Sequence, residues 1–454
     1  MQAYFFYIMR LHRNLVYTTI DSLNAIFNEG EYADKVVARA LKKDKRWGSS
    51  DRKFVAETIY EVVRWKRLYA EIAEVREPFN REDLWRMFAV WAVLRGYPIP
   101  DWRQLEGTPE RKIKGRFDEL SKIRKMRESI PDWMDELGVK ELGEALWTKE
   151  IAAQNQPAKV ILRVNTLKST KENLRSLLMD LNIETEFLKD QTDALVLKER
   201  ANVFLTDAFK EGLFEVQDAS SQLVAAFLDV QPGMRVVDTC AGAGGKTLAI
   251  GASMRNTGRL YAMDTSAHRL DALKPRLARS QLSNVHPAAI AHERDDRVKR
   301  LAGKIDRVLV DAPCSGLGTL RRNPDLKWRQ TLQSVAELQA KQFSILTAAA
   351  KLLKVGGRLV YATCSILKQE NQEIIEAFLK IHPEFELLDP KVVLTAPFPR
   401  QNDLPIGASA DSLFWQLWPH QHETDGFFAA ILQRRPNPLD PSKVMPASDL
   451  AVSE

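Results

Sequence analysis

From about residue 216 the sequence alternates short apolar runs with loops and helix patterns, and this alternation limits the possible folds most strongly. Four of the apolar runs end in a polar residue, at 236–238, 260–264, 308–311 and 359–363. A helix is expected between the last two, from Leu338 to Leu353, ended by Gly356-Gly357. Such alternation is typical of a mostly parallel sheet covered on both faces. It predicts an α/β domain whose ligand lies at the carboxyl ends of the strands.

The segments before this domain have different patterns. Apolar residues at helical spacing in 33–41 and 55–63 predict an all-helical domain over 1–128. Apolar runs at 160–164 and 194–197, with a helix pattern at 174–181 between them, predict a small α+β module over 129–215. The α/β domain then spans 216–435. The Pro-rich polar tail at 436–454 is expected to be disordered.

Basic residues gather in two clusters of the helical domain, although the whole chain has a net charge of only +6. The segment 35–67 holds eleven Lys or Arg residues and four acidic ones, and a second cluster spans 111–127. One such run is most simply a solvated helix face. Two in one domain, together with Arg321-Arg322, favour binding to the phosphate backbone of a nucleic acid.

The chain has only three cysteines, Cys240, Cys314 and Cys364, and no pair has CxxC spacing. A disulfide framework and a zinc site are therefore not expected, and no metal is predicted. The apolar run at 3–9 is too short to span a membrane and lacks the basic region of a signal peptide. We expect a cytoplasmic protein that is a monomer and does not bind membranes.

The segment DTCAGAGGKT at 238–247 follows a predicted strand and opens a helix, which is the place of a ligand-binding glycine loop. It is not a P-loop, because Cys240 stands where the first glycine is required and Asp238 would repel phosphates. The glycine register of a dinucleotide site is also missing. A nucleoside ligand without a phosphate tail remains, and Asp264 and Asp295 at the ends of the next strands are candidates for binding it.

Two cysteines follow strand ends on the same expected edge, Cys314 in DAPCSG and Cys364 in TCS. An isolated cysteine is usually an inert core residue, but two at this edge favour chemistry. Methylation of a pyrimidine at C5 needs a thiolate that adds to C6, and a carboxyl group such as Asp311 near the base. The residues alone do not decide which cysteine is the nucleophile.

Together, DTCAGAGGKT, DAPCSGLGTLRRNPDLKW, YATCSILKQEN and DGFFAAIL resemble the Sun/Nop family of S-adenosylmethionine-dependent RNA cytosine-5 methyltransferases, of the bacterial ribosomal-RNA (RsmB-like) type. The resemblance covers about 129–432, and 30–70 is similar to a NusB-like RNA-binding domain. It implies a Rossmann-like class I methyltransferase sheet with S-adenosylmethionine as the cofactor.

The resemblance also implies roles for individual residues. Asp264 would hold the ribose, Asp295 would lie by the adenine, and Asp311 would sit between cofactor and base. Cys364 would be the nucleophile and Cys314 would assist product release, with Lys246 counted in the catalytic group. The cofactor loop would consist of Cys240, Ala241, Gly242, Ala243, Gly244, Gly245 and Lys246.

Two features depart from the family pattern or leave an assignment open. Ala243 replaces the usual proline of the loop, which would loosen it, and Asp296 competes with Asp295 for the ligand role.

The resulting hypothesis is methyl transfer to C5 of a cytosine in RNA, ribosomal RNA in the first place, through a covalent adduct between a cysteine and C6. The alternatives are a transfer-RNA cytosine-5 methyltransferase, a DNA cytosine-5 methyltransferase, and a catalytically idle RNA-binding factor of ribosome assembly. Cys364 argues against the DNA enzyme, which would rely on the cysteine after the proline. The presence of both cysteines, Lys246 and Asp311 argues against an idle factor.

Overall fold

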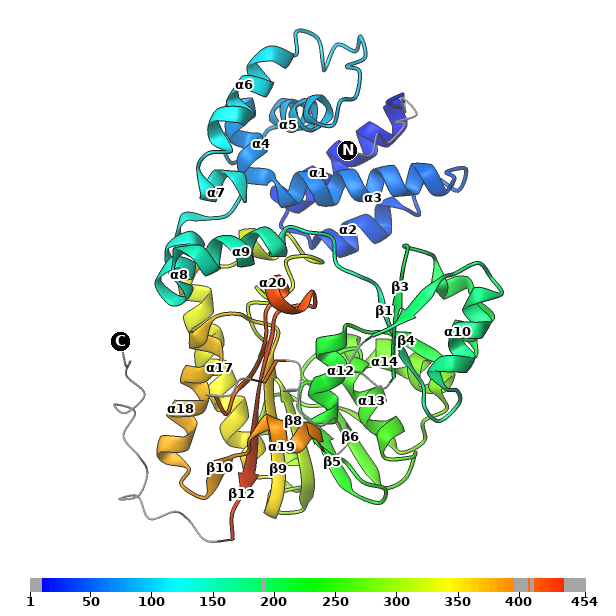
Figure 1. The fold of residues 1–454 in the computed structure, drawn as a ribbon, viewed down its shortest axis with the longest axis vertical. Coiled ribbons are helices and arrows are strands. Elements are labelled where there is room, and N and C mark those ends of the chain that lie inside the picture. Colours follow the sequence, from blue (N-terminus) through cyan, green and yellow to red (C-terminus); the bar gives the residue numbers. More distant parts are fainter. Residues whose placement is uncertain (1–9, 189–192, 396–406, 409–411, 437–454) are drawn as a thin grey trace. The chain divides into compact units, whose positions relative to one another are not determined.

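A computed structural model describes residues 10–188, 193–395, 407–408 and 412–436. The apolar run at 3–9 and the predicted tail from 437 onward lie outside these residues. Contacts divide the described chain into two compact units, 10–157 with Leu320–Thr331, and 158–319 with 332–436 (Figure 1). This division falls after Pro157 and differs from the domain boundaries suggested by the sequence, which remain predictions.

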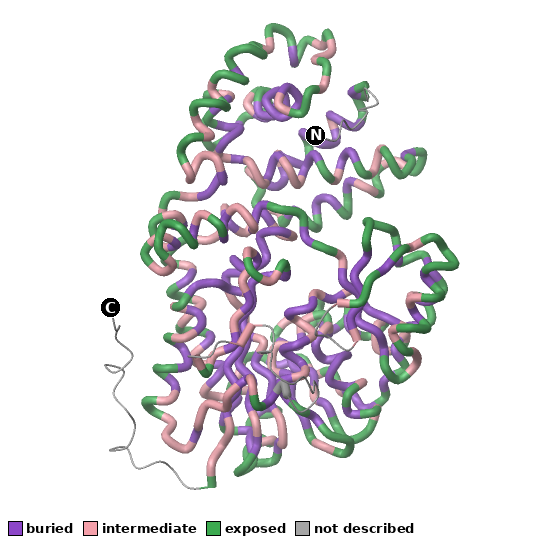
Figure 2. The backbone as a smooth tube through the Cα atoms, viewed as in Figure 1, coloured by how far each residue is buried: buried purple, intermediate pink, exposed green. Residues whose placement is uncertain are grey.

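The first unit is helical throughout its described residues. Helix α5 is its centre, with Leu84, Met87, Phe88 and Ala92 all at or near zero exposure. The apolar stripes at 33–41 and 55–63 form α2 and α3 and face this core, as predicted. Figure 2 shows the buried backbone of the unit along the facing sides of its helices. The helices are α1 (Arg13–Phe27), α2 (Ala33–Ala40), α3 (Ser49–Arg64), α4 (Lys66–Ala73), α5 (Arg81–Leu94), α6 (Glu110–Leu120), α7 (Arg124–Arg127), α8 (Asp132–Leu142), α9 (Glu144–Gln154) and α16 (Leu326–Arg329).

Helix α16 belongs to a segment, Leu320–Thr331, that the sequence assigns to the α/β domain but that packs within the helical unit. The Trp328 indole N–H donates to Val63 O at 2.7 Å. Arg321, expected to bind phosphate, is only 8% exposed, and its guanidinium donates to Pro157 O at 3.0 Å. We therefore correct that expectation, because Arg321 is a buried side chain bonded within this unit.

The second unit begins with a four-stranded antiparallel sheet in the order β2-β3-β1-β4. The two predicted strands are β1 and β3, which pair with each other, and the predicted helix is α10. Strands β2 and β4 have three residues each, too few to show an alternating pattern. The elements are β1 (Ile161–Val164), α10 (Lys171–Met179), β2 (Thr185–Phe187), β3 (Ala194–Leu197), η1 (Val203–Leu205), α11 (Asp207–Lys210) and β4 (Phe214–Val216).

A larger sheet follows, in the order β10-β12-β9-β8-β5-β6-β7, with β11 paired to β12. Strands β7, β6, β5, β8 and β9 are parallel, and β12 is antiparallel to β9. This is the predicted Rossmann-like α/β sheet. Its elements are α12 (Ala219–Ala226), β5 (Arg235–Asp238), α13 (Gly245–Ser253), β6 (Arg259–Asp264), α14 (Ala267–Ser280), β7 (Val285–Ala289), α15 (Asp296–Lys299), β8 (Ile305–Asp311), α17 (Leu332–Ala350), β9 (Leu353–Thr363), η2 (Lys368–Glu370), α18 (Gln372–Ile381), β10 (Phe385–Leu387), α19 (Pro390–Thr395), β11 (Trp415–Leu417), α20 (Pro419–His422) and β12 (Phe427–Arg434).

Helices cover both faces of this sheet (Figure 1). Successive strand residues point to opposite faces, so Val236 packs in the core under α12, α13 and α14, while Val237 packs in the core under α17 and α18. Tyr361 and Val360 on β9 alternate in the same way. Burial on both faces explains why these strands are continuous apolar runs.

Strand order reverses between β5 and β8, because the chain goes from β5 outward to β6 and β7 and then returns to β8 on the other side. Ligands of such sheets bind at this reversal, outside the carboxyl ends of the strands. The glycine loop follows β5 and the Cys314 loop follows β8. The topology therefore places both at the expected ligand edge.

The helix expected at 338–353 was predicted too long at its end. Helix α17 ends at Ala350, and Leu353 already pairs with Ile305 as the first residue of β9. The next paired residue of β9 is Arg358, opposite Arg307, so a bulge separates the two pairs. Gly356, with φ +77°, lies in this bulge and not at a helix end.

Candidate active site

The glycine loop joins β5 to α13 and is fixed by its neighbours. Gly244 has φ +86°, and a Cβ there would lie 2.1 Å from Leu273 Cδ1 of α14. Only glycine fits this position, because the left-handed conformation and the close approach of α14 both exclude a side chain. Gly242 also has a positive φ, +54°, but open space surrounds it.

Asp264 at the end of β6 ties the glycine loop to the next strand. Its carboxylate accepts hydrogen bonds from Gly242 N at 2.8 Å and Ser266 N at 2.7 Å, one on each oxygen. The side chain is largely buried, at 7% exposure. Each carboxylate oxygen has a second acceptor direction, so the group retains capacity to accept hydrogen bonds from hydroxyl groups.

Two arginines that the sequence analysis did not select support the loop from behind. Arg276 of α14 donates to Ala243 O at 2.7 Å, and Arg163 of β1 donates to Gly245 O at 2.6 Å. Burial lowers the pKa of Arg163 to about 10. Glu215 of β4 pairs with Arg276 at 2.9 Å. Ala243, in place of the usual proline, therefore has its carbonyl held by a guanidinium.

Asp238 closes β5 beneath the loop and is almost completely buried. Its Oδ2 accepts from Thr247 Oγ1 at 2.7 Å, while Oδ1 has no hydrogen-bond partner among the described residues. Burial raises the pKa of Asp238 to about 7. Burial also raises the pKa of the neighbouring Cys240 thiol, so this cysteine keeps its proton. In the sequence, Asp238 indicates only that phosphates are disfavoured, and no local pattern marks it as a site residue.

Lys246 and Asp311 join the loop after β5 to the end of the adjacent strand β8. The ammonium lies 2.7 Å from Asp311 Oδ2 and 5.0 Å from the centroid of the Phe427 ring. Lys246 is 9% exposed, whereas the Asp311 side chain is 29% exposed. The lysine is thus fixed between a carboxylate and an aromatic face, and Asp311 is open on one side.

The loop after β7 distinguishes the two neighbouring aspartates. Asp295 caps α15, with Oδ1 accepting from Arg297 N and Oδ2 from Ala291 N, both at 2.9 Å. These backbone hydrogen bonds lower the pKa of Asp295. Asp296 is exposed and pairs with Lys299 at 3.1 Å. Asp295 is therefore the acid that the loop holds in a fixed position.

Cys314 and Cys364 come together although fifty residues separate them. They follow β8 and β9, which are neighbouring parallel strands with Asp311 opposite Ala362, and their sulfur atoms are 3.4 Å apart. The hydrogen bond with Cys364, burial, and the charges of Cys364 and Glu370 raise the pKa of the Cys314 thiol. The raised pKa favours the protonated form of Cys314.

Two glycines permit this approach of the loops. Gly318 N donates to Cys364 O, and Gly426 N donates to Gly318 O, each at 2.8 Å. A Cβ on Gly318 would lie 2.2 Å from Gly426 O. Both glycines occur in the motifs quoted above, but their packing role depends on contacts that the sequence does not display.

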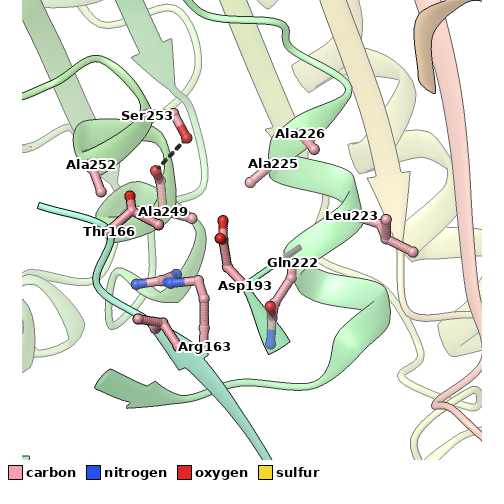
Figure 3. A pocket seen from close by; sticks show the side chains of 11 residues that line it. Arg163, Thr166, Asp193, Gln222, Leu223, Ala225, Ala226, Ala249, Ala252 and Ser253 are labelled. Carbon is pink, nitrogen blue, oxygen red and sulfur yellow. Dashed lines mark hydrogen bonds between the residues drawn. The ribbon is translucent and has the colours of Figure 1, made fainter. Parts of the chain in front are cut away.

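A separate small pocket lies between β1, α12 and α13 (Figure 3). Arg163, Asp193, Gln222 and Ser253 are among the residues that line it. None of the predicted site residues does, so the pocket is not part of the candidate site.

Two other kinds of feature are absent from the described residues. They contain no group of three or more His, Cys, Asp or Glu side chains arranged to hold a metal ion. Among the same residues, no helix has both the length and the apolar run needed to cross a membrane.

Comparison with known families gives two matches. Residues 225–433 match the model of the 16S rRNA methyltransferase RsmB/F, and residues 130–204 match the ferredoxin-like domain of RsmF/B-like methyltransferases. A Synechocystis protein named "Probable ribosomal RNA small subunit methyltransferase B" is 32% identical over 93% of this chain and 99% of its own. The ribosomal RNA small subunit methyltransferase B of Salmonella typhi is 36% identical over 63% of this chain and 65% of its own.

Solved structures agree with these matches. The crystal structure of a protein called PH0851 has a TM-score of 0.78 and 26% identity, and the alignment covers 94% of this chain and all of that one. A methyltransferase homologue from Pyrococcus horikoshii has a TM-score of 0.58 and 27% identity, with 69% of this chain and 97% of that one covered.

Proposed function

Because the chain belongs to the RsmB/F family of 16S rRNA methyltransferases and is thus an RNA methyltransferase, we propose that it methylates C5 of a cytosine in small-subunit ribosomal RNA. The methyl donor is S-adenosylmethionine. The protein acts in the cytoplasm, which agrees with three cysteines that form no disulfide. The observation that carries the proposal is the 3.4 Å separation of two thiols at the ligand edge of the sheet.

The donor set at the glycine loop fits S-adenosylmethionine better than a nucleotide. Asp238, Asp264 and Asp311 lie at three strand ends around the loop. The carboxylates of Asp264 and Asp311 favour a cationic ligand with hydroxyl groups and disfavour phosphates, whereas buried Asp238, whose pKa is raised to about 7, adds little charge. Asp264 would bind the ribose, the loop from Cys240 to Lys246 would enclose the ligand, and Asp295 would lie by the adenine. When bound, the cofactor supplies an electrophilic methyl group.

Cys364 is the proposed nucleophile. Its thiolate forms a bond to C6 of the cytosine, which places electron density on C5 and makes that carbon nucleophilic. After C5 has gained the methyl group, removal of the C5 proton leaves the electron pair of the broken C–H bond on C5. This pair expels the Cys364 thiolate from C6 by elimination. Carbon C6 returns to the aromatic ring, and the thiolate is regenerated.

Cys314, Asp311 and Lys246 assist these steps. Cys314 lies beside Cys364 and holds its proton at rest. Its proposed role is to give this proton up to solvent and then, as a thiolate, to accept the C5 proton so that the product is released. The open side of Asp311 would accept a hydrogen bond from the cytosine N4 edge. Lys246 fixes Asp311 by the ion pair at 2.7 Å.

Fewer basic side chains of the helical unit are available to bind RNA than the sequence suggested. Several basic side chains of the two clusters are in ion pairs, as Lys112 is with Glu74 at 2.5 Å and Lys125 with Asp132 at 2.8 Å. We propose that phosphates contact the exposed basic residues that make no ion pair within the described part of this unit. In the two clusters these are Lys35, Lys42, Lys45, Arg111, Lys114 and Lys122.

Labelled methyl transfer tests the reaction. Small subunits from cells that lack the gene are incubated with the protein and methyl-labelled S-adenosylmethionine, and the RNA is digested to nucleosides. The label should be in 5-methylcytidine, and Cys364→Ala should abolish it. Label in another nucleoside would overturn the proposed position. No label in any RNA would favour an idle assembly factor, and label only in transfer RNA would change the substrate.

A further inference from the structure

Glu370 is a buried carboxylate that lies between the two cysteine loops and has no role in the steps above. It is the last residue of η2, six positions after Cys364, and its exposure is zero. Tyr361 of β9, also fully buried, donates its hydroxyl to Glu370 O at 2.6 Å. The backbone at Glu370 is therefore fixed to the strand that ends beside Cys364.

Four donors surround this carboxylate. Oε1 accepts from Ser315 N at 2.8 Å and from Gln342 Nε2 at 2.9 Å. Oε2 accepts from both the Ser315 and the Ser365 hydroxyls, whose oxygens are 3.2 Å apart. A carboxylate offers about four acceptor positions, so all of them are used. Ser315, Ser365 and Gln342 are fully buried, as Glu370 is.

The two serines are the residues directly after the two cysteines, Ser315 after Cys314 and Ser365 after Cys364. A single carboxylate oxygen thus joins the two loops one residue away from each thiol. Gln342 of α17 also donates to Pro313 O at 3.0 Å, which fixes the Cys314 loop from its other side.

We propose that Glu370 is a positioning residue for the paired cysteines: it holds the two sulfur atoms together and keeps a negative charge beside Cys314. This inference deepens the proposed function and rests on it. Both thiols must reach the same pyrimidine ring, at C6 and near C5, so their separation matters for the reaction. The charge helps Cys314 to keep its proton.

Substitution by glutamine separates the charge from the geometry. The carbonyl oxygen of the glutamine would still accept hydrogen bonds from Ser315 N and Gln342 Nε2. In this geometry these two N–H groups can only donate. The glutamine amide would face the two serine hydroxyls, which rotate and become acceptors. Glu370→Gln therefore removes the charge with little change of position, whereas Glu370→Ala removes both.

The test uses the full chain and two readouts, with Glu376→Gln on the exposed face of α18 as the matched control. Alkylation of each cysteine by iodoacetamide is followed by mass spectrometry from pH 6 to 10. The groups facing Cys314 are Cys364, Glu370 and Tyr361. Glu370→Gln should shift Cys314 alkylation to lower pH, and the control should not.

The second readout is methyl transfer. Glu370→Ala should lower kcat about 100-fold, the cost of a misplacement near 1 Å, with KM for S-adenosylmethionine unchanged. The kcat of Glu370→Gln should lie between the kcat of the wild type and that of Glu370→Ala. The alkylation readout needs neither RNA nor methyl donor, so it stands even if the proposed reaction fails. The proposal would be overturned if Glu370→Gln had both the wild-type pH dependence of Cys314 alkylation and the wild-type kcat. It would also be overturned if Glu370→Ala lost S-adenosylhomocysteine binding together with its activity.

Discussion

The glycine loop allows a prediction that separates steric clash from backbone strain. Gly242→Ala and Gly244→Ala each place a Cβ on a residue with positive φ, which costs about 1–2 kcal/mol for an L-residue. At Gly242 nothing lies within 4 Å of the new atom, but at Gly244 Leu273 Cδ1 lies 2.1 Å away. Leu273 is fully buried, and overpacking of such a core adds about 1–3 kcal/mol.

Urea unfolding of both variants, followed by circular dichroism, measures the difference. Gly244→Ala should lower the free energy of unfolding by about 2–5 kcal/mol in total, clearly more than Gly242→Ala. Combining Gly244→Ala with Leu273→Ala should recover about 1–3 kcal/mol of coupling, because the clash is removed. Equal losses for the two single variants, or no coupling to Leu273, would refute this account of the loop.

Three further predictions concern charge. The pKa of Asp238 is raised to about 7 in the folded state from an ordinary value near 3.8. The stability that this group contributes is therefore complete below pH 3.8 and is lost as the pH rises through 7. Thermal unfolding at several pH values should show a smaller fall of Tm with rising pH in Asp238→Asn than in the wild type. Lys114→Ala should weaken RNA binding and reduce the slope of log affinity against log salt concentration by about 0.7. Lys112 is already paired with Glu74, so Lys112→Ala should cause a smaller change of affinity and slope in the same titration. Lys246→Met leaves Asp311 without its cation and should lower the free energy of unfolding by about 1–3 kcal/mol in urea.

The sequence predicted those parts of the fold that local pattern encodes. Strands β5, β6, β8 and β9 are buried on both faces, so their apolar runs and polar ends are visible without tertiary information. Their shared direction then brings the ends of β8 and β9, with Cys314 and Cys364, to one edge of the sheet.

The remaining features depend on contacts that local pattern does not encode. Leu353 continues an apolar helical spacing, and only its pairing with Ile305 makes it a strand residue. Most of the segment 320–331 belongs to a motif quoted for the α/β domain, but Trp328 at the end of that motif packs in the helical unit. Glu370 was missed because a short polar segment such as KQEN is normally exposed, and its burial requires four donors from three other parts of the chain.

The identity of the nucleophile is the central claim, and a trapped complex tests it most directly. RNA that carries 5-fluorocytosine has no C5 proton to lose, so elimination stops and the enzyme remains attached to C6. Wild-type protein is incubated with this RNA and S-adenosylmethionine, digested with protease and nuclease, and the modified peptide is sequenced by mass spectrometry. The nucleotide should be attached to Cys364, and Cys314→Ala should form such an adduct even with ordinary RNA. Attachment to Cys314, or the absence of any adduct while methylation proceeds, would contradict the assignment of Cys364 as the nucleophile.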